Sequence, residues 1–387
     1  MCCQPPPPDR SSGGPALTGT MGRIVVVVTI ILLLALVAAA TWARSGAQAP
    51  AGAAAPPATA APASQTSEAK ALAPPTGPTP GSRPAEATAT VALAPTPPPT
   101  PSSPPIPTGT FYPLAVMVEN LADARPLSGL TRADIVYEAL VEGGITRFMS
   151  VYINGESDTI GPVRSSRPYF VYLAAEFNAS YVHIGWSPQA LGALQATGIT
   201  DLDEIRGDPG FWRVNTRPAP HNAYTSTALL RSTLDRVRRI TPGSTAGFHF
   251  RTDPSPIQGP EAAKISIQYA PDYRVDYLYS PEDRLYRRSM DGLPHEDAET
   301  GEQVAARDLV IQYVNAWVID SVGRLNMTQV GKGKALYFRD GVVAEGSWRK
   351  ASLGDVTEWY DAKGRPVPMS PGKIWVEIVP PGTPVEY

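Results

Sequence analysis

Residues 180–196 have the sequence SYVHIGWSPQALGALQA, in which a short apolar run precedes a helix-like run. Residues 180–184 are apolar and bounded by Gly185, a pattern typical of a buried strand. Ser187 is suited to cap a helix over residues 188–196, because its hydroxyl can accept a hydrogen bond from a free N–H group of the first turn. The stretch therefore predicts a strand followed by a helix, which is the repeating unit of α/β sheets.

The flanking sequence extends this pattern in both directions. Residues 114–118 and 135–151 are apolar and predict further strands, whereas 167–177 and 227–237 carry apolar residues at helical spacing. Ser226 is suited to cap the helix over 227–237, as Ser187 caps the one over 188–196. Strands that alternate with helices predict an α/β (or α+β) N-terminal domain over residues 111–260.

The pattern changes after residue 260. Apolar and polar residues alternate in short segments separated by turn residues such as Asp340-Gly341, and no long helix is predicted after residue 297. We therefore predict a mostly antiparallel β C-terminal domain over residues 261–387, packed on the first. The predicted strands are 264–269, 274–279, 284–289, 309–314, 324–330, 334–338, 342–348 and 373–379.

The N-terminal part contains a twenty-residue segment without a charge, IVVVVTIILLLALVAAATWA at 24–43. A helix of that length spans about 30 Å, the thickness of a bilayer's hydrocarbon core. We predict a transmembrane signal anchor, with 1–23 as a short cytoplasmic tail and the C-terminal module outside the cytoplasm. The alternative is a signal peptide cleaved after the A-Q-A of 47–49, although the apolar run exceeds the usual length for one. Both place the module outside the cytoplasm.

Residues 44–110 consist largely of Ala, Pro, Thr, Ser and Gly. Such a composition contains too little apolar surface to offset the entropy of ordering, so it predicts a disordered stalk. If fully extended as polyproline II, this stalk would reach on the order of 200 Å from the bilayer.

Charge and cysteine content exclude several classes of function for residues 111–387. This part carries 28 of the 33 Lys and Arg residues and 33 of the 36 Asp and Glu residues. It is therefore mildly acidic, with no basic cluster suited to nucleic acid. Both cysteines, Cys2 and Cys3, precede it, which excludes disulfides, Cys-based zinc sites and thiol catalysis. Phosphate loops and dinucleotide fingerprints are absent, and no second His or Cys pair supports His295, so we expect neither a cofactor nor a metal.

Several longer stretches resemble the bacterial YerB-like family. They are PLAVMVENLADARPLSGLTRADIVYEALVEGGITRFM (113–149), IGPVRSSRPYFVYLAAEF (160–177), APHNAYTS (219–226), LPHEDAETGEQ (293–303), GRLNMTQVGKGKALYFRDGVVAEGSWRK (323–350) and PGKIWVEIVP (371–380). Many members of this family are lipoproteins and its biochemical role is undefined, so the resemblance implies an envelope location and a two-domain architecture but no reaction. No cysteine follows the apolar run here, so a helix rather than a lipid is expected to anchor the chain.

The densest polar cluster is Arg164-Ser165-Ser166-Arg167, directly before a predicted helix. Two guanidinium groups beside the free N–H groups of a helix N-terminus are suited to bind a carboxylate or phosphate. Alternatively, each arginine pairs with an internal acid such as Glu138 or Glu142.

A second candidate is the loop 217–224, in which two prolines hold His221, Asn222 and Tyr224 in place for hydrogen bonding or proton transfer. A well-packed turn with His221 bonded to the backbone is the alternative. His183 ends a buried strand, where α/β sheets bind ligands, but strand histidines also occur as satisfied core residues. The predicted ligand-binding residues are Arg164, Ser165, Arg167, His183, His221, Asn222 and Tyr224, and the candidates for catalysis are His221 and Glu142. We expect Arg164, Arg167 and His221 to line one anion-binding pocket, with His183 between them.

Three functions fit this sequence. The first is a membrane-anchored, extracytoplasmic module that binds an anionic wall-related ligand, such as a cell-wall peptide or polymer, or an envelope protein. The second is an envelope hydrolase or lyase that uses His221 with a carboxylate, and the third is a structural assembly subunit. A serine hydrolase is excluded, because Ser187 in GWSPQ lacks the second glycine of a nucleophile elbow.

Overall fold

A computed structural model describes residues 109–237, 239–251 and 257–387 of the chain. The predicted cytoplasmic tail, transmembrane anchor and stalk, and both cysteines, lie outside the described residues. Within the described ranges, no helix has the length and apolar character needed to cross a bilayer.

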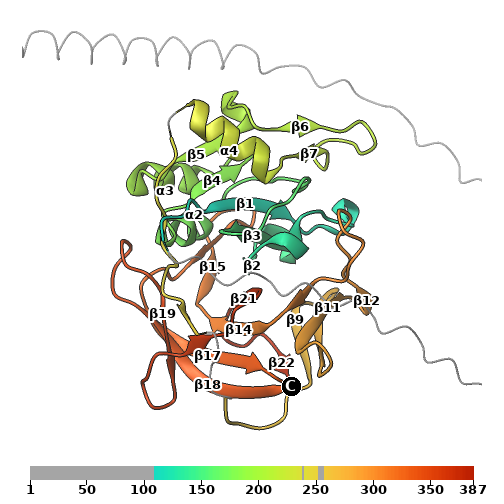
Figure 1. Ribbon diagram of the computed structural model, residues 1–387, viewed down its shortest axis with the longest axis vertical. Helices are drawn as coiled ribbons and strands as arrows, with labels where there is room; N and C mark the ends of the chain where they lie inside the picture. Colours follow the sequence, from blue (N-terminus) through green and yellow to red (C-terminus); the bar gives the residue numbers. More distant parts are fainter. Residues whose placement is uncertain (1–108, 238, 252–256) are drawn as a thin grey trace, which may run out of the picture. The chain divides into compact units, whose positions relative to one another are not determined.

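The fold is organised around one ten-stranded sheet that draws strands from both halves of the sequence (Figure 1). The strand order is β19-β18-β17-β14-β21-β2-β3-β1-β4-β5. The first half contributes β1 (Leu114–Glu119), β2 (Ile135–Leu140), β3 (Thr146–Tyr152), β4 (Ser180–His183) and β5 (Asp201–Asp203). The second half contributes β14 (Asp308–Tyr313), β17 (Gly331–Arg339), β18 (Val342–Lys350), β19 (Glu358–Asp361) and β21 (Ile374–Val379).

Strand β21 joins the two halves. It pairs in parallel with β2 on one side and with β14 on the other, so that Ile374 lies opposite both Ile135 and Asp308. All six of its residues are buried, as expected for a strand covered on both faces. The described residues thus combine an α/β part with a β-rich part, as predicted, but they are joined through a shared sheet, which the sequence analysis did not predict. The domain boundary at residue 260 stays a prediction.

Three α-helices occur in the described residues: α2 (Pro168–Glu176), α3 (Pro188–Thr197) and α4 (Thr227–Arg236). The predicted N-caps are confirmed, because the Ser187 hydroxyl accepts a hydrogen bond from Ala190 N and the Ser226 hydroxyl accepts one from Leu229 N, each at 3.2 Å. Apolar residues of α2 and α3 share a core cluster with one face of the large sheet.

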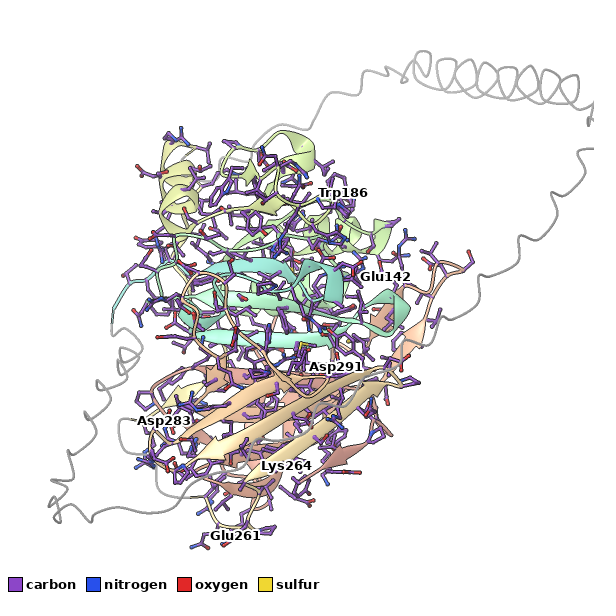
Figure 2. The ribbon with its side chains drawn as sticks, turned by 90° about the vertical axis from the view of Figure 1, so that its right-hand side faces the viewer. Glu142, Trp186, Glu261, Lys264, Asp283 and Asp291 are labelled. Carbon is purple, nitrogen blue, oxygen red and sulfur yellow. The ribbon has the colours of Figure 1, made fainter. Side chains whose placement is uncertain are left out.

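A second sheet packs on the other face of the large sheet, with strand order β12-β11-β10-β9-β22 and β13 paired to β11. Alternating apolar residues of β9 and β10 belong to the same core cluster as apolar residues of β1, β2 and β3. Figure 2 shows this sheet across the front of the lower half, where Lys264 marks β9. Its strands are β9 (Lys264–Ala270), β10 (Tyr273–Ser280), β11 (Leu285–Met290), β12 (Leu293–Pro294), β13 (Ala305–Ala306) and β22 (Val385–Glu386).

Short paired strands and single-turn 3-10 helices complete the described elements. The strands are β6 (Trp212–Arg213), β7 (Ala223–Tyr224), β8 (His249–Phe250), β15 (Ala316–Val318), β16 (Leu325–Met327) and β20 (Pro368–Met369). The 3-10 helices are η1 (Ala122–Ala124), η2 (Leu130–Arg132), η3 (Glu142–Gly144) and η4 (Glu204–Arg206). The Asp340-Gly341 hairpin turn is confirmed, with both residues at positive φ between β17 and β18.

Three charged residues are fully buried where the two sheets meet: Glu138 on β2, Glu377 on β21 and Arg288 on β11. The Arg288 Nη2 atom donates to both carboxylate oxygens of Glu138, at 2.7 and 2.9 Å. The hydroxyls of Tyr269 and Tyr277 donate to Glu377 at 2.6 and 2.5 Å. Burial, together with the charge of Glu138 beside it, raises the pKa of Glu377 well above its ordinary value. Arg288 therefore supplies the positive charge that stabilises Glu138 and Glu377 side by side inside the protein.

Replacing Arg288 by methionine tests this role. We expect Arg288→Met to lower the free energy of unfolding by about 3–5 kcal/mol, because it leaves Glu138 buried without its counter-ion. Arg287→Met is the matched control, since the Arg287 side chain is 41% exposed and pairs with Asp283 at the surface, so its loss should cost less than about 1 kcal/mol. Equilibrium unfolding in urea measures both values. Equal losses in the two variants would contradict the assignment.

Candidate functional site

The predicted site residues gather where parallel strands of the large sheet end. Strands β1, β2 and β4 run in the same direction, so their carboxyl ends lie along one edge. Glu119 is the last residue of β1 and Glu142 follows β2, while Arg147 lies near the start of the antiparallel β3, opposite Glu119. In Figure 2, Glu142 and Trp186 are on the same side of the first half of the fold. The carboxyl edge is where α/β sheets bind their ligands.

The loop over residues 160–167 is fixed between β1 and β4. The Arg164 N–H donates to Met117 O at 3.0 Å, and the Arg164 carbonyl accepts from Ile184 N at 3.1 Å. Gly161, at φ +147°, allows a close approach to β7, since a Cβ there would lie 2.8 Å from the ring of Tyr224. Arg164 is therefore held at the edge by its own backbone.

Glu119 brings two of the predicted residues together. Its Oε1 atom lies 3.0 Å from Arg164 Nε, and its Oε2 atom lies 2.8 Å from His221 Nδ1. Glu119 is buried, whereas the side chains of Arg164 and His221 retain 22% and 15% exposure. Arg164 and the loop with His221 thus meet at a partly open edge, through an acid that the sequence analysis did not select.

Arg167 binds Glu142, which was one of the alternatives left open by the sequence. Its Nε atom donates to Glu142 Oε2 at 2.9 Å, its Nη2 atom contacts Oε1, and its Nη1 atom donates to Ser166 O at 2.8 Å. Partial burial raises the pKa of Glu142, but the hydrogen bonds and charge of Arg167 outweigh it, so this pKa lies below its ordinary value. Helix α2 begins at the next residue, Pro168.

Arg147 is a third arginine at this edge, and the sequence analysis did not select it. It is 4% exposed, and its Nη1 atom donates to Ser165 O at 2.8 Å. Its Nε atom is buried without a hydrogen-bond partner, and no carboxylate of the described residues forms an ion pair with it. Burial and the charges of Arg167 and Arg164 lower the pKa of Arg147 to about 10. We call Arg147, Arg164 and Arg167 the arginine cluster. Among the described residues, its three guanidinium groups face two carboxylates, those of Glu119 and Glu142.

His183 is held inside the fold. Its Nε2 atom lies 3.1 Å from Asp201 Oδ2, its Nδ1 atom donates to Gly185 O at 3.0 Å, and the residue is fully buried. These contacts match the alternative in which His183 is a satisfied core residue that supports the ends of β4 and β5.

The other predicted residues contribute to the shape of the site. The Asn222 amide accepts from Arg213 Nη1 at 2.8 Å and donates to Val214 O at 3.2 Å, so it stabilises the β6–β7 hairpin. Tyr224 is buried and stacks on Trp212, with ring centroids 6.4 Å apart. Ser165 provides the carbonyl that Arg147 binds.

The two residues that sequence reasoning missed, Glu119 and Arg147, both carried a signal. Glu119 directly follows the apolar strand predicted over 114–118, at the end where ligands bind. Arg147 is the single basic residue inside the apolar stretch 135–151. A charge in an otherwise buried strand is costly and so indicates a specific role.

No group of three or more metal-ligating side chains occurs in the part of the chain that the structure describes. His295, the residue considered for a metal, is buried and accepts a hydrogen bond at Nδ1 from Arg288 Nη1, at 2.6 Å.

Comparisons with known proteins agree on one family. Two family models match, described as the N-terminal domain (residues 106–239) and the C-terminal domain (residues 265–376) of a "Protein of unknown function (DUF3048)". A curated protein of Bacillus subtilis (strain 168), described as "Putative lipoprotein YerB", is 36% identical over 273 residues, which cover 69% of this chain and 81% of that protein. The crystal structure of YerB protein from Bacillus subtilis superimposes with a TM-score of 0.64 at 34% identity, covering 72% of this chain and 94% of that one.

Proposed function

Because this chain belongs to the DUF3048 family, with both its N- and C-terminal domains matched, we propose that it is an envelope-associated protein that binds an anionic ligand at the arginine cluster. The description of the relative as a lipoprotein supports the envelope location. The predicted anchor at 24–43 and the stalk at 44–110 would hold the module outside the cytoplasm, above the bilayer.

The observation that carries the proposal is that Arg147 is buried without a carboxylate partner among the described residues. A buried guanidinium without a carboxylate partner is costly, and two further arginines beside it add repulsion. An incoming anion would supply the missing negative charge and accept hydrogen bonds from the free edge of Arg147. Planar guanidinium groups bind carboxylates and phosphates through paired hydrogen bonds, so an arginine cluster favours these anions.

A carboxylate at the end of a cell-wall peptide, or an acidic group of a wall polymer, has the required chemistry. An acidic side chain of an envelope protein would fit the same three guanidinium groups. In each case Glu119 and Glu142 hold Arg164 and Arg167 in place before the ligand arrives. These side chains therefore lose little conformational entropy on binding.

Replacing Arg147 by methionine separates binding from stability. We expect Arg147→Met to lower the affinity for soluble wall peptides at least about tenfold, because it removes a charge-assisted hydrogen bond to the ligand. The same change should leave the free energy of unfolding unchanged or raised, since it removes a buried charge that has no partner. Calorimetric titration and urea unfolding measure the two effects.

The matched control is Arg349→Met, which removes an arginine that stacks on Tyr360 at 4.6 Å and does not belong to the cluster. Binding should survive in this variant. If Arg147→Met bound the peptides as the unaltered protein does, or lost several kcal/mol of stability, Arg147 would be a structural residue and the proposed function would fail.

The pairing of Glu119 with His221 favours a second candidate function, that of an envelope hydrolase or lyase. A carboxylate that binds Nδ1 orients the imidazole and leaves Nε2 free for proton transfer. The Nε2 atom of His221 has no hydrogen-bond partner among the described residues. Glu119 is the better carboxylate for this role than Glu142, because Glu119 contacts His221 directly whereas Glu142 binds Arg167.

Turnover of purified cell-wall fragments tests this second function. If the protein is an enzyme, His221→Gln should reduce the rate about 100-fold or more, the scale expected for loss of a general acid or base. His249→Gln is the matched control, because His249 is an exposed histidine on β8, and it should retain full activity. Chromatography of the released fragments measures the rate. Absence of turnover in the unaltered protein would exclude the enzyme and leave the binding function standing.

Fractionation of cells tests the anchor. We expect the full-length protein to remain in the membrane fraction after an alkali wash, because an apolar helix over 24–43 is held by the hydrocarbon core. A variant lacking 24–43 should appear in the soluble fraction. Recovery of the unaltered protein in the soluble fraction, with an N-terminus near Ala49, would contradict a retained anchor and indicate a cleaved signal peptide.

A further inference from the structure

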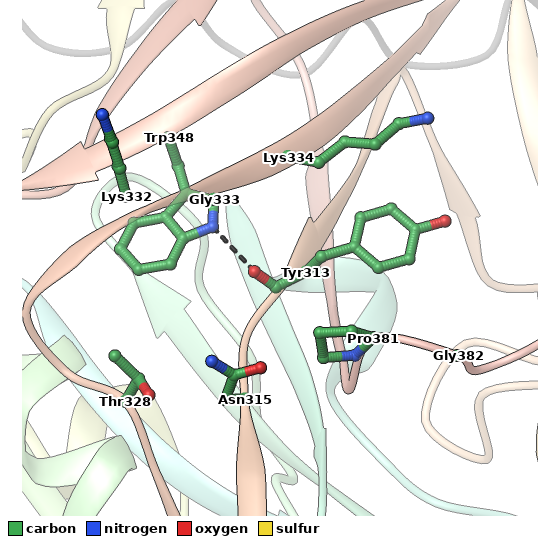
Figure 3. A pocket seen from close by; sticks show the side chains of 9 residues that line it. All are labelled: Tyr313, Asn315, Thr328, Lys332, Gly333, Lys334, Trp348, Pro381 and Gly382. Atoms are coloured by element: carbon green, nitrogen blue, oxygen red, sulfur yellow. Dashed lines mark hydrogen bonds between the residues drawn. The ribbon is translucent and has the colours of Figure 1, made fainter.

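A cavity of about 390 Å³ lies in the second half of the fold, and none of its lining residues belongs to the arginine cluster (Figure 3). Its volume falls within the range of about 300–1,000 Å³ that is common for small-molecule sites. Its walls come from the end of β14, the start of β17, the end of β18 and the segment after β21. Strands β14 and β21 are parallel, so the cavity lies at their carboxyl ends.

The polar groups of the cavity are largely unused by the protein. Lys334 pairs with Glu345 at 2.7 Å, but Lys332 forms no ion pair or hydrogen bond within the described residues. The side chains of Asn315, Thr328 and Tyr313 likewise have no hydrogen-bond partner there. The cavity therefore offers one free cation, a second one nearby, and several neutral groups able to donate and accept hydrogen bonds.

The aromatic wall of the cavity is held in place before any ligand binds. The indole Nε1 of Trp348 donates to Tyr313 O at 2.9 Å, and Trp348 is almost fully buried. Gly333 allows this arrangement, because a Cβ at that position would lie 2.5 Å from Trp348 Nε1. Figure 3 shows the rings of Trp348 and Tyr313 between the two lysines at the top of the view and Asn315 and Thr328 at the bottom.

An exposed aromatic residue continues this surface along the β15–β16 hairpin. Asn315 and Thr328 form the base of the hairpin, and the next pair on the same face is Trp317 with Asn326, because side chains alternate along a strand. Trp317 is 47% exposed, so its indole is accessible from solvent. A flat apolar platform thus lies one step beyond the cavity.

We propose that this cavity binds one unit of an acidic oligosaccharide, with the neighbouring unit stacked on Trp317. The carboxylate of the bound unit pairs with Lys332, and its hydroxyls bond to Asn315, Thr328 and Tyr313. The apolar face of the next sugar ring covers the indole of Trp317. This site is independent of the arginine cluster and of the function proposed for it.

Calorimetric titration of the full-length protein tests the site with three probes: linear trigalacturonate, D-galacturonate and neutral D-galactose. We expect saturable binding of trigalacturonate, weaker binding of galacturonate and none of galactose. Lys332→Ala should weaken binding of both acidic probes about tenfold or more, because it removes a charge-assisted hydrogen bond. Trp317→Ala should weaken the trimer alone and leave the monomer unchanged.

Two controls complete the design. Lys363→Ala removes an exposed lysine in the turn after β19, outside the cavity, and should bind all probes as the unaltered protein does. The titrations are repeated in the Arg147→Met background, where the arginine cluster is disabled, so that binding lost in Lys332→Ala is assigned to this cavity. No binding of the trimer, or full binding by Lys332→Ala, would overturn the proposal. Equal affinity for monomer and trimer would overturn the placement of a second sugar on Trp317.

Discussion

The fold depends on how one buried cation, Arg288, is held between the two sheets. Its guanidinium group binds Glu138 and lies 5.0 Å and 5.3 Å from the ring centroids of Trp375 and Phe148. A desolvated charge tolerates few alternative positions, because every displacement leaves a carboxylate or a guanidinium without a partner. This ion pair therefore ties β11 of the second sheet to β2 of the first, at the point where Glu377 of β21 lies directly beside Glu138.

The same buried network reaches the candidate site through neighbouring residues of two strands. The Asn120 side chain donates to Thr146 Oγ1 at 2.8 Å and to Glu138 Oε1 at 3.3 Å. Asn120 follows Glu119, and Thr146 precedes Arg147, so the backbone on both sides of the site is tied to the core. Successive side chains of a strand point to opposite faces of the sheet. The hydrogen bonds of Asn120 and Thr146 on one face therefore fix the backbone that positions Glu119 and Arg147 on the other face. The arginine cluster is thereby held together despite the repulsion between its guanidinium groups, which is the preorganisation that an anion site needs.

Local signals in the sequence were sufficient for the helices and turns but not for their assembly. Ser187 and Ser226 predicted two helix starts because capping depends on only a few adjacent residues. Arg164 and the loop of His221 were expected to lie together, and they do, but the acid that joins them was not identified. Glu119 lies 45 residues before Arg164 and 102 before His221, so its role depends on strand pairing that no local pattern encodes. The position of β21 between β2 and β14 could not be predicted from the sequence for the same reason.

The parallel pairing of β21 has a consequence for function. Because β14, β21, β2, β1 and β4 all run in one direction, their carboxyl ends lie along the same edge of one continuous sheet. The arginine cluster is at the ends of β1, β2 and β4, and the cavity near Lys332 is at the ends of β14 and β21. The family's N- and C-terminal sequence segments therefore do not present two unrelated surfaces. Both supply positive charge to one edge, and a long acidic polymer is the kind of ligand for which such a shared orientation matters.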